Sequence, residues 1–270
     1  MRASSPIDLA RRRWIGAVAL GGLAGCASAP DAAARAALAP TGTLRIAVYA
    51  GSPSSLVRLP GSAEERGLSV DIGRELARRL GVPAQLVEYP RVAEVVGALQ
   101  RGEADVTITN ASAERLKLLD FTPPLLALEL GVLVREGSPL KSIDDLDTAG
   151  LRVGVSQGSS SDRAMRSRLQ RATLLTMPTL QAARDALAAA QLDAFATNKA
   201  ILFELNDRLP GARVLDGRWG LEHLALATGQ GRTAGLQWLR RFAADVQAEG
   251  LVQRAAQRAG LRGTVAPDAR

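Results

Sequence analysis

Residues 105–125 read DVTITNASAERLKLLDFTPPL, and the predicted strands and helices are arranged around this segment. The alternating run at its start predicts a β-strand ending in Asn110, and Ser112 is suited to cap the N-terminus of a following helix. Arg115 then falls in the first helical turn, where acidic residues are usual because that end of the helix dipole is positive. Taken alone, such an arginine could equally point into water. Taken with the strand, the polar turn and the helix start, it predicts an anion-binding cradle.

Strands and helices alternate around this stretch. The expected elements are strands at 44–48, 85–89 and 105–109, and helices at about 70–80 and 92–100. This order predicts an α/β fold whose largely parallel sheet carries helices on both faces. Because such sheets bind ligands at the carboxyl ends of their strands, the cradle is expected at a binding edge.

The second half of the chain repeats this design. Residues 98–110 and 186–198 align without a gap, and the matches include Asp105 with Asp193. Each copy runs from a helix end into a strand that finishes in Thr-Asn, which predicts two similar lobes. Before the second copy, strand 151–155 opens into a loop in which Gly158 precedes three serines. Loops of this kind are usually only loops, but opposite Arg115 this one predicts a second anion cradle on the facing lobe.

The N-terminal segment has the composition of an export signal. Three arginines, Arg11 to Arg13, precede an apolar run that is too short to span a bilayer. Leu23-Ala24-Gly25-Cys26 resembles the bacterial lipobox, whose cysteine is acylated and becomes the first mature residue. Cys26 is the only cysteine in the chain, so no internal disulfide is possible. We expect a lipoprotein signal peptide at 1–25 and a flexible tether at 26–42, with the Sec and twin-arginine export routes both open.

Composition limits the remaining classes of function. The net charge of +7 is dispersed and aromatic residues make up 3% of the chain, a composition that argues against nucleic-acid binding. His223 is the only histidine, so neither a histidine metal site nor a histidine-based catalytic triad is expected. No cofactor is expected.

From about Thr43 to Gly263 the chain resembles the solute-binding proteins of ABC importers, in the polar amino-acid family known as family 3. The matching segments are Gly42–Val48, Gly67–Ile72, Leu99–Asp105, Ser112–Arg115, Asp120–Thr122, Ser142–Leu146 and Gly158–Ser160. The resemblance implies a type 2 periplasmic-binding-protein fold with two α/β lobes joined by two crossing strands. We place those strands near 131–134 and 224–228. Lobe one would then hold 43–130 plus 228–263, lobe two 131–227, and a tail 264–270.

The resemblance also implies roles for matched residues. Arg115 would form a bidentate ion pair with a ligand carboxylate, and Ser112 and Asn110 would hydrogen-bond the ligand. From the other lobe, Ser160 would hold the carboxylate together with the neighbouring backbone at Gly158 and Ser159.

Four further residues are interpreted, two of them because the chain departs from the family pattern there. Asn198 stands where amino-acid binders usually have an aspartate for the ligand ammonium, which predicts weak recognition of an α-ammonium. Tyr49 is expected to replace in part an aromatic residue that is missing from the loop after the first strand. Glu129 and Glu222 flank the expected crossing strands and are interpreted as hinge or rim residues.

The function predicted from these features is solute binding and not catalysis. A monomer anchored by lipid at the periplasmic face of a membrane would capture a small carboxylate-bearing solute and deliver it to an ABC permease. Two alternatives stay open. One is a receptor that presents its ligand to a membrane sensor kinase, and the other is a dehydratase-type enzyme, which would need a general acid in the cleft.

Overall fold

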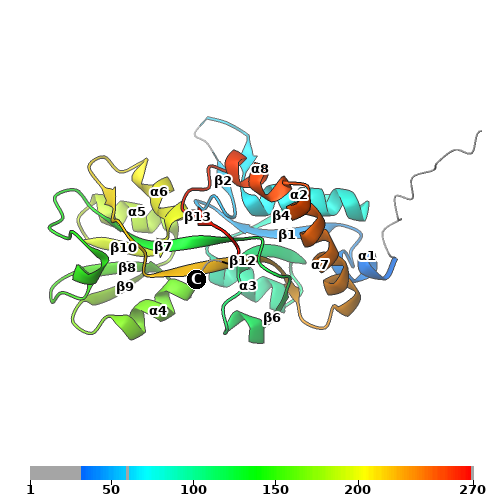
Figure 1. Ribbon diagram of the computed structural model, residues 1–270, viewed down its shortest axis with the longest axis horizontal. Coiled ribbons are helices and arrows are strands. Elements are labelled where there is room, and N and C mark those ends of the chain that lie inside the picture. Colours follow the sequence, from blue (N-terminus) through cyan, green and yellow to red (C-terminus); the bar gives the residue numbers. More distant parts are fainter. Residues whose placement is uncertain (1–31, 59–60, 269–270) are drawn as a thin grey trace, which may run out of the picture.

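The computed structural model describes residues 32–58 and 61–268, which form two α/β lobes on either side of two long strands (Figure 1). These strands are β7 (Leu126–Val134) and β12 (Gly220–Gly229). Both belong to one continuous mixed sheet with the order β4-β1-β5-β12-β7-β10-β8-β9. Strands β4, β1 and β5 lie in lobe one, strands β10, β8 and β9 lie in lobe two, and β12 and β7 connect them.

The other elements have the following bounds. The strands are β1 (Leu44–Tyr49), β2 (Val57–Arg58), β3 (Glu65–Arg66), β4 (Ala84–Tyr89), β5 (Val106–Asn110), β6 (Leu119–Phe121), β8 (Arg152–Ser156), β9 (Thr173–Met177), β10 (Ala194–Asn198), β11 (Arg213–Val214) and β13 (Thr264–Val265). The α-helices are α1 (Ala32–Leu38), α2 (Leu68–Leu80), α3 (Val92–Gln100), α4 (Ser160–Arg168), α5 (Leu180–Ala188), α6 (Lys199–Asn206), α7 (Thr233–Ala248) and α8 (Leu251–Arg258), with 3₁₀ turns at η1 (Arg115–Lys117) and η2 (Ile143–Leu146).

Lobe one places helices on both faces of its sheet, as the order of elements predicted. Strand β1 pairs in parallel with β4 and β5. Its alternate residues Leu44, Ile46 and Val48 pack with α2, α7 and α8, whereas Ala47 packs with α3 on the opposite face. The helices expected at about 70–80 and 92–100 are confirmed as α2 and α3, and α2 ends at Gly81 with a φ of 66°.

Lobe two has the same layered arrangement. Strands β10, β8 and β9 are parallel, with α5 and α6 packed on one face. Helix α4 and η2 cover the other face. Phe195 of β10 is completely buried under α5 and α6, while its neighbours Ala194 and Ala196 face the α4 side.

The two aligned aspartates have equivalent surroundings, which confirms the internal repeat. Asp105 accepts bonds from the backbone N and the guanidinium of Arg45, the second residue of β1, at 2.8–2.9 Å. Asp193 accepts the same set from Arg152, the first residue of β8, at 3.0 Å. In each lobe, therefore, a carboxylate just before one parallel strand is anchored to the start of its neighbour.

We expect Asp193→Asn to lower stability in a pH-dependent way. The bonds from Arg152 lower the pKa of Asp193 from 3.8 to about 2, a difference that corresponds to roughly 2 kcal/mol. Because the folded pKa is the lower one, this contribution is complete above the unfolded pKa of about 4 and disappears as the pH falls through about 2. Urea unfolding should separate the two proteins at pH 7 and bring them together near pH 2. Parallel curves of unfolding free energy against pH would contradict this account.

The crossing segments differ in position from those expected. The two strands pair with each other from Leu126 to Leu130 and from Gly220 to Leu224. The segments predicted, 131–134 and 224–228, pair instead with β10 of lobe two and β5 of lobe one. Both strands are continuous through the crossing, so the end of a lobe is marked only by a change of pairing partner. The sequence does not reveal these partners.

The described parts of the expected tether and tail, residues 32–42 and 264–268, contain regular structure. Residues 32–38 form α1, whose Leu38 is completely buried beside Gly235 of α7. The alanine-rich run has high helix propensity, and Leu38 gives it an apolar anchor. At the other end, β13 pairs with β7, and the carbonyl of Pro267 lies 3.1 Å from Nδ1 of His223. The export signal, Cys26 and residues 27–31 lie outside the described residues.

Candidate functional site

A cavity between the lobes lies at the carboxyl ends of the central strands. It measures about 550 Å³, including the part open to solvent. Its walls include the last residues of strands from both lobes, namely Tyr49, Thr109, Asn110, Ser156, Thr197 and Asn198. This is the edge at which the alternating order of elements predicted a site.

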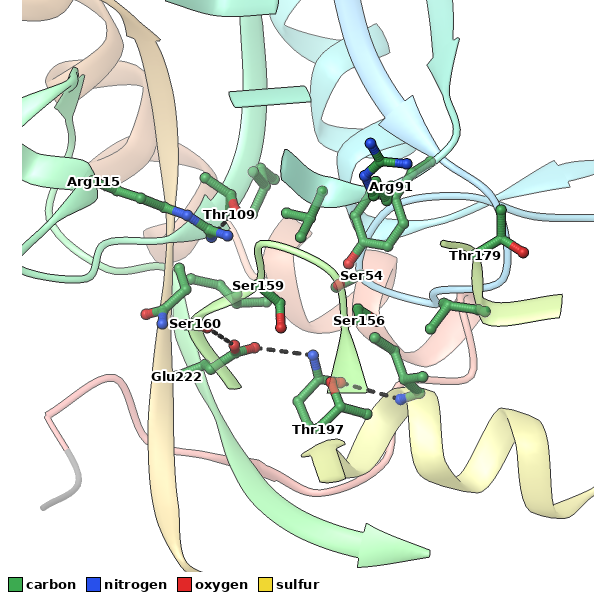
Figure 2. A pocket seen from close by; sticks show the side chains of 18 of the residues that line it. Ser54, Arg91, Thr109, Arg115, Ser156, Ser159, Ser160, Thr179, Thr197 and Glu222 are labelled. Carbon is green, nitrogen blue, oxygen red and sulfur yellow. Dashed lines mark hydrogen bonds between the residues drawn. The ribbon is translucent and has the colours of Figure 1, made fainter. Parts of the chain in front are cut away.

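Arg115 enters this cavity as a buried cation. It is 4% exposed, and its Nη1 donates to Oγ1 of Thr109 at 2.7 Å (Figure 2). Within the described chain, its guanidinium forms no ion pair with a carboxylate at 4.0 Å or less. Burial lowers the pKa of Arg115, and the nearby Glu222 carboxylate acts in the opposite direction. An arginine remains protonated even so, which leaves a positive charge suited to an anionic ligand.

The segment that carries Arg115 is shorter than expected. Instead of a helix starting at Ser112, the structure has the single 3₁₀ turn η1. The N-cap of this turn is Glu114 and not Ser112, although Oγ of Ser112 accepts from the backbone N of Arg115 at 3.3 Å. A turn of three residues has little dipole, so the anion-binding character of this side of the cavity comes from the guanidinium itself.

The serine loop on the opposite lobe has internal partners. Ser159 caps α4 by accepting from the backbone N of Asp162 at 3.0 Å, and the N–H of Gly158 donates to Asp162 at 2.9 Å. A Cβ at Gly158, whose φ is 69°, would lie 2.9 Å from Cβ of Ala93 in lobe one. Gly158 therefore permits close contact between the lobes, and its N–H group is already satisfied.

Glu222 is the site residue that the sequence interpretation missed. It lies on β12, is 7% exposed and lines the cavity. Its Oε1 accepts from Oγ of Ser160 at 2.6 Å, and its Oε2 accepts from Nδ2 of Asn198 at 2.9 Å (Figure 2). A glutamate inside strand segment 221–226, where the only other polar residue is His223, was a signal for a buried functional carboxylate.

Asn198 positions this carboxylate. Its Oδ1 accepts from the backbone N of Ile201 at 3.1 Å, which caps α6 and orients Nδ2 toward Glu222. The sequence interpretation took Asn198 as a sign of weak ammonium recognition. Glu222 removes the basis for that inference, because it supplies a negative charge to the same cavity.

The remaining residues of the predicted site are distributed as follows. Asn110 lines the cavity, but its Oδ1 accepts from the backbone N of His223 at 3.1 Å. Tyr49 also lines it, and burial raises the pKa of its phenol. The structure thus gathers Tyr49, Asn110, Arg115, Ser159, Ser160 and Asn198 around one cavity, whereas Ser112 and Gly158 are not among its lining residues.

Two other kinds of feature are absent from the described residues. In 32–58 and 61–268, no group of three or more histidine, cysteine, aspartate or glutamate side chains could hold a metal ion. None of the helices found there is long and apolar enough to cross a membrane.

Solved structures of amino-acid-binding proteins share this fold. A substrate-binding protein of an amino acid ABC transporter from Streptococcus pneumoniae, bound to L-arginine, superposes with a TM-score of 0.74 at 19% identity, covering 83% of this chain and 96% of that one. An ancestral amino acid-binding protein, described as a precursor of cyclohexadienyl dehydratase, superposes with a TM-score of 0.71 at 23% identity, covering 81% and 95%. The periplasmic-binding-protein fold is therefore confirmed.

Sequence comparison identifies the family. The ABC transporter glutamine-binding protein GlnH of Bacillus subtilis (strain 168) is 26% identical over 179 residues. That match covers 65% of this chain and 65% of the relative, slightly under two thirds of its length. The sequence model of the family described as bacterial extracellular solute-binding proteins, family 3, matches residues 44–260. The chain belongs to this family of bacterial extracellular solute-binding proteins.

Proposed function

We propose that the chain is the solute-binding component of an ABC importer. It captures a small solute carrying both a carboxylate and an ammonium group, and delivers it to a membrane permease. The observation that carries this proposal is the presence of Arg115 and Glu222, both buried, in the lining of one cavity between the lobes.

The carboxylate half of the proposal rests on Arg115. A buried charge without an ionic partner is unfavourable, and a ligand carboxylate would supply that partner together with charge-assisted hydrogen bonds. Thr109 holds one nitrogen of the guanidinium, which limits the orientations in which it can bind. The binding cost is therefore reduced because the receptor group is already oriented.

The ammonium half of the proposal rests on Glu222. Asn198 Nδ2 can only donate, and it faces one oxygen of Glu222 while the Ser160 hydroxyl faces the other. These two bonds fit an ionised carboxylate and leave acceptor capacity for a ligand N–H group. A zwitterion would then neutralise both buried charges at once.

Contacts between the lobes support a closing motion about β7 and β12. Arg163 of α4 forms an ion pair with Glu114 of lobe one, and Gly51 of lobe one packs against Leu180 of α5. Such contacts would stabilise a closed form, and opening by a hinge would release them.

A thermal-shift panel tests the proposal. Amino acids, the hydroxy-acid analogue of each and the corresponding amines should be compared on the purified protein, because a ligand of the folded state raises its melting temperature. We expect amino acids to give the largest shifts. If hydroxy acids or amines gave equal shifts, the paired recognition of two charges would be wrong, and if no compound gave a shift, amino-acid binding itself would be contradicted.

One observation favours a second candidate function. Glu222 is a buried carboxyl group inside the cleft, and a dehydratase-type enzyme would need such a group, in its protonated form, as a general acid. Mass spectrometry of a ligand incubated with the protein distinguishes the two functions. A binding protein returns the ligand unchanged, whereas loss of one water from the ligand would establish the enzyme.

We also propose that Cys26 is acylated and anchors the chain at the periplasmic face of a membrane. The motif 23–26 and membership in an extracellular family support this. Helix α1 begins six residues after Cys26, so the anchor would hold lobe one close to the lipid surface. Cys26→Ser is expected to move the protein from the membrane fraction to the soluble exported fraction. Unchanged membrane retention and processing of this variant would exclude acylation.

A further inference from the structure

A second arginine reaches the binding cavity. Arg91 stands between β4 and α3, at the N-cap position of that helix, and lines the cavity together with Pro90 and Val92. Its Nη2 donates to Oε1 of Glu94 at 2.6 Å. Within the described chain its Nε and Nη1 make no hydrogen bond, so the guanidinium has donors to offer a ligand. In Figure 2, Arg91 lies on the opposite side of the view from Arg115 and Glu222.

The charges that line the cavity do not balance. Arg91 and Arg115 are cations, Glu222 is the anion, and the other described lining residues carry no charged side chain. Glu94 opposes Arg91 from outside the cavity lining, where its side chain is 38% exposed and solvent weakens its effect. The best electrostatic complement is a ligand with two anionic groups and one cationic group.

A second cavity adjoins the first one near Arg91. This second cavity of about 920 Å³, including the part open to solvent, shares Pro90, Thr179 and Leu180 with the first. Arg91 lines the first cavity and follows Pro90 in the chain, so a distal group directed toward the junction of the two cavities would approach Arg91. The adjoining cavity itself is lined by charges of both signs, namely Arg58, Glu88, Arg184, Glu204 and Arg208.

We infer that the ligand is an acidic amino acid, whose main carboxylate binds Arg115, whose ammonium binds Glu222 and whose distal carboxylate binds Arg91. This inference rests on the proposed function and narrows it. It separates the chain from binders of basic amino acids, because a distal ammonium or guanidinium would meet a like charge at Arg91.

Matched pairs of acid and amide test this assignment. Glutamate against glutamine, and aspartate against asparagine, differ only in the distal group. By titration calorimetry the wild-type protein should bind at least one acid tenfold or more tightly than its amide, a ratio equivalent to about 1.4 kcal/mol. Arg91→Gln should reduce that ratio to within about threefold while changing the affinity for the amide little, since the amide does not use the charge.

Two further variants make the result specific. Arg101→Gln removes the same charge from the exposed residue after α3, where Arg101 pairs with Glu103, and should leave the ratio unchanged. Arg91→Lys keeps the charge without the planar fork, and should retain part of the preference. If Arg91→Gln failed to fold, Arg91→Lys would still test the role of this position.

The outcomes separate the inference from the proposed function. Equal affinity for acid and amide, or a preference for the amide, would overturn the role of Arg91 while leaving a zwitterion-binding protein. An unchanged ratio in Arg91→Gln would overturn it as well. If neither acid nor amide of either pair bound the wild-type protein, both this inference and amino-acid binding would be contradicted.

Discussion

Replacing Arg115 by alanine is expected to weaken ligand binding by at least tenfold. A hydrogen bond to a charged group contributes about 1.5–3 kcal/mol, and about 1.4 kcal/mol corresponds to a factor of ten. The side chain is 4% exposed, so water cannot replace it in the binding of a carboxylate. Arg115→Lys should recover little affinity, because an ammonium keeps the charge and loses the two-pronged geometry.

The same substitution is expected to have little effect on the ligand-free protein. Arg115 is buried without an ionic partner among the described residues, so its removal relieves a desolvation cost and breaks one bond, to Thr109. Calorimetric titration measures affinity, and thermal unfolding without ligand measures stability. Arg101→Ala, an exposed arginine, serves as the control. If Arg115→Ala bound the ligand as tightly as the wild-type protein, Arg115 would not be the group that binds the ligand carboxylate.

Glu222→Gln is expected to cost at least tenfold in affinity for amino acids and much less for the hydroxy-acid analogues. The substitution keeps the shape of the side chain and removes its charge, so the ligand ammonium loses a charge-assisted partner. A glutamine has one oxygen and one NH₂ group, so only one of the donors Asn198 and Ser160 can keep its acceptor, and the other loses its hydrogen bond. The ratio of the two affinities isolates the ammonium contribution.

Glu129→Gln is a matched control for this prediction. Glu129 lies on β7, the other crossing strand, and pairs with Lys199 at 2.7 Å instead of lining the cavity. The control should leave the ratio of amino acid to hydroxy acid unchanged. An unchanged ratio in Glu222→Gln would show that the ammonium is recognised elsewhere.

Much of the fold could be predicted because its signals are local. The apolar spacing of 70–80 and 92–100 gave both helices, and the alignment of Asp105 with Asp193 indicated two lobes. Arg115 was found because a cation in a presumed first helical turn conflicts with the helix dipole. The conflict led to the right residue, although the turn proved to be three residues long.

The remaining features depend on pairing between distant segments. Glu222 reaches the cavity because β12 crosses between the lobes, and its bonds to Ser160 and Asn198 span 62 and 24 residues of chain. From the sequence, Glu222 was interpreted as a rim residue because it lies beside an expected crossing strand. Its burial depends on the register between β12 and β7, which the sequence does not show. For the same reason Gly158 was taken for a ligand contact, while its neighbour Ala93 belongs to the other lobe.

A crystal structure with the tightest-binding amino acid of the panel would show whether Arg115 and Glu222 hold the two charges of the ligand. We expect the main carboxylate within about 3 Å of the Arg115 guanidinium and the ammonium at a similar distance from Glu222, with both lobes closed on the ligand. A ligand bound outside this cavity, or bound inside it with its ammonium away from Glu222 and its carboxylate away from Arg115, would contradict the account.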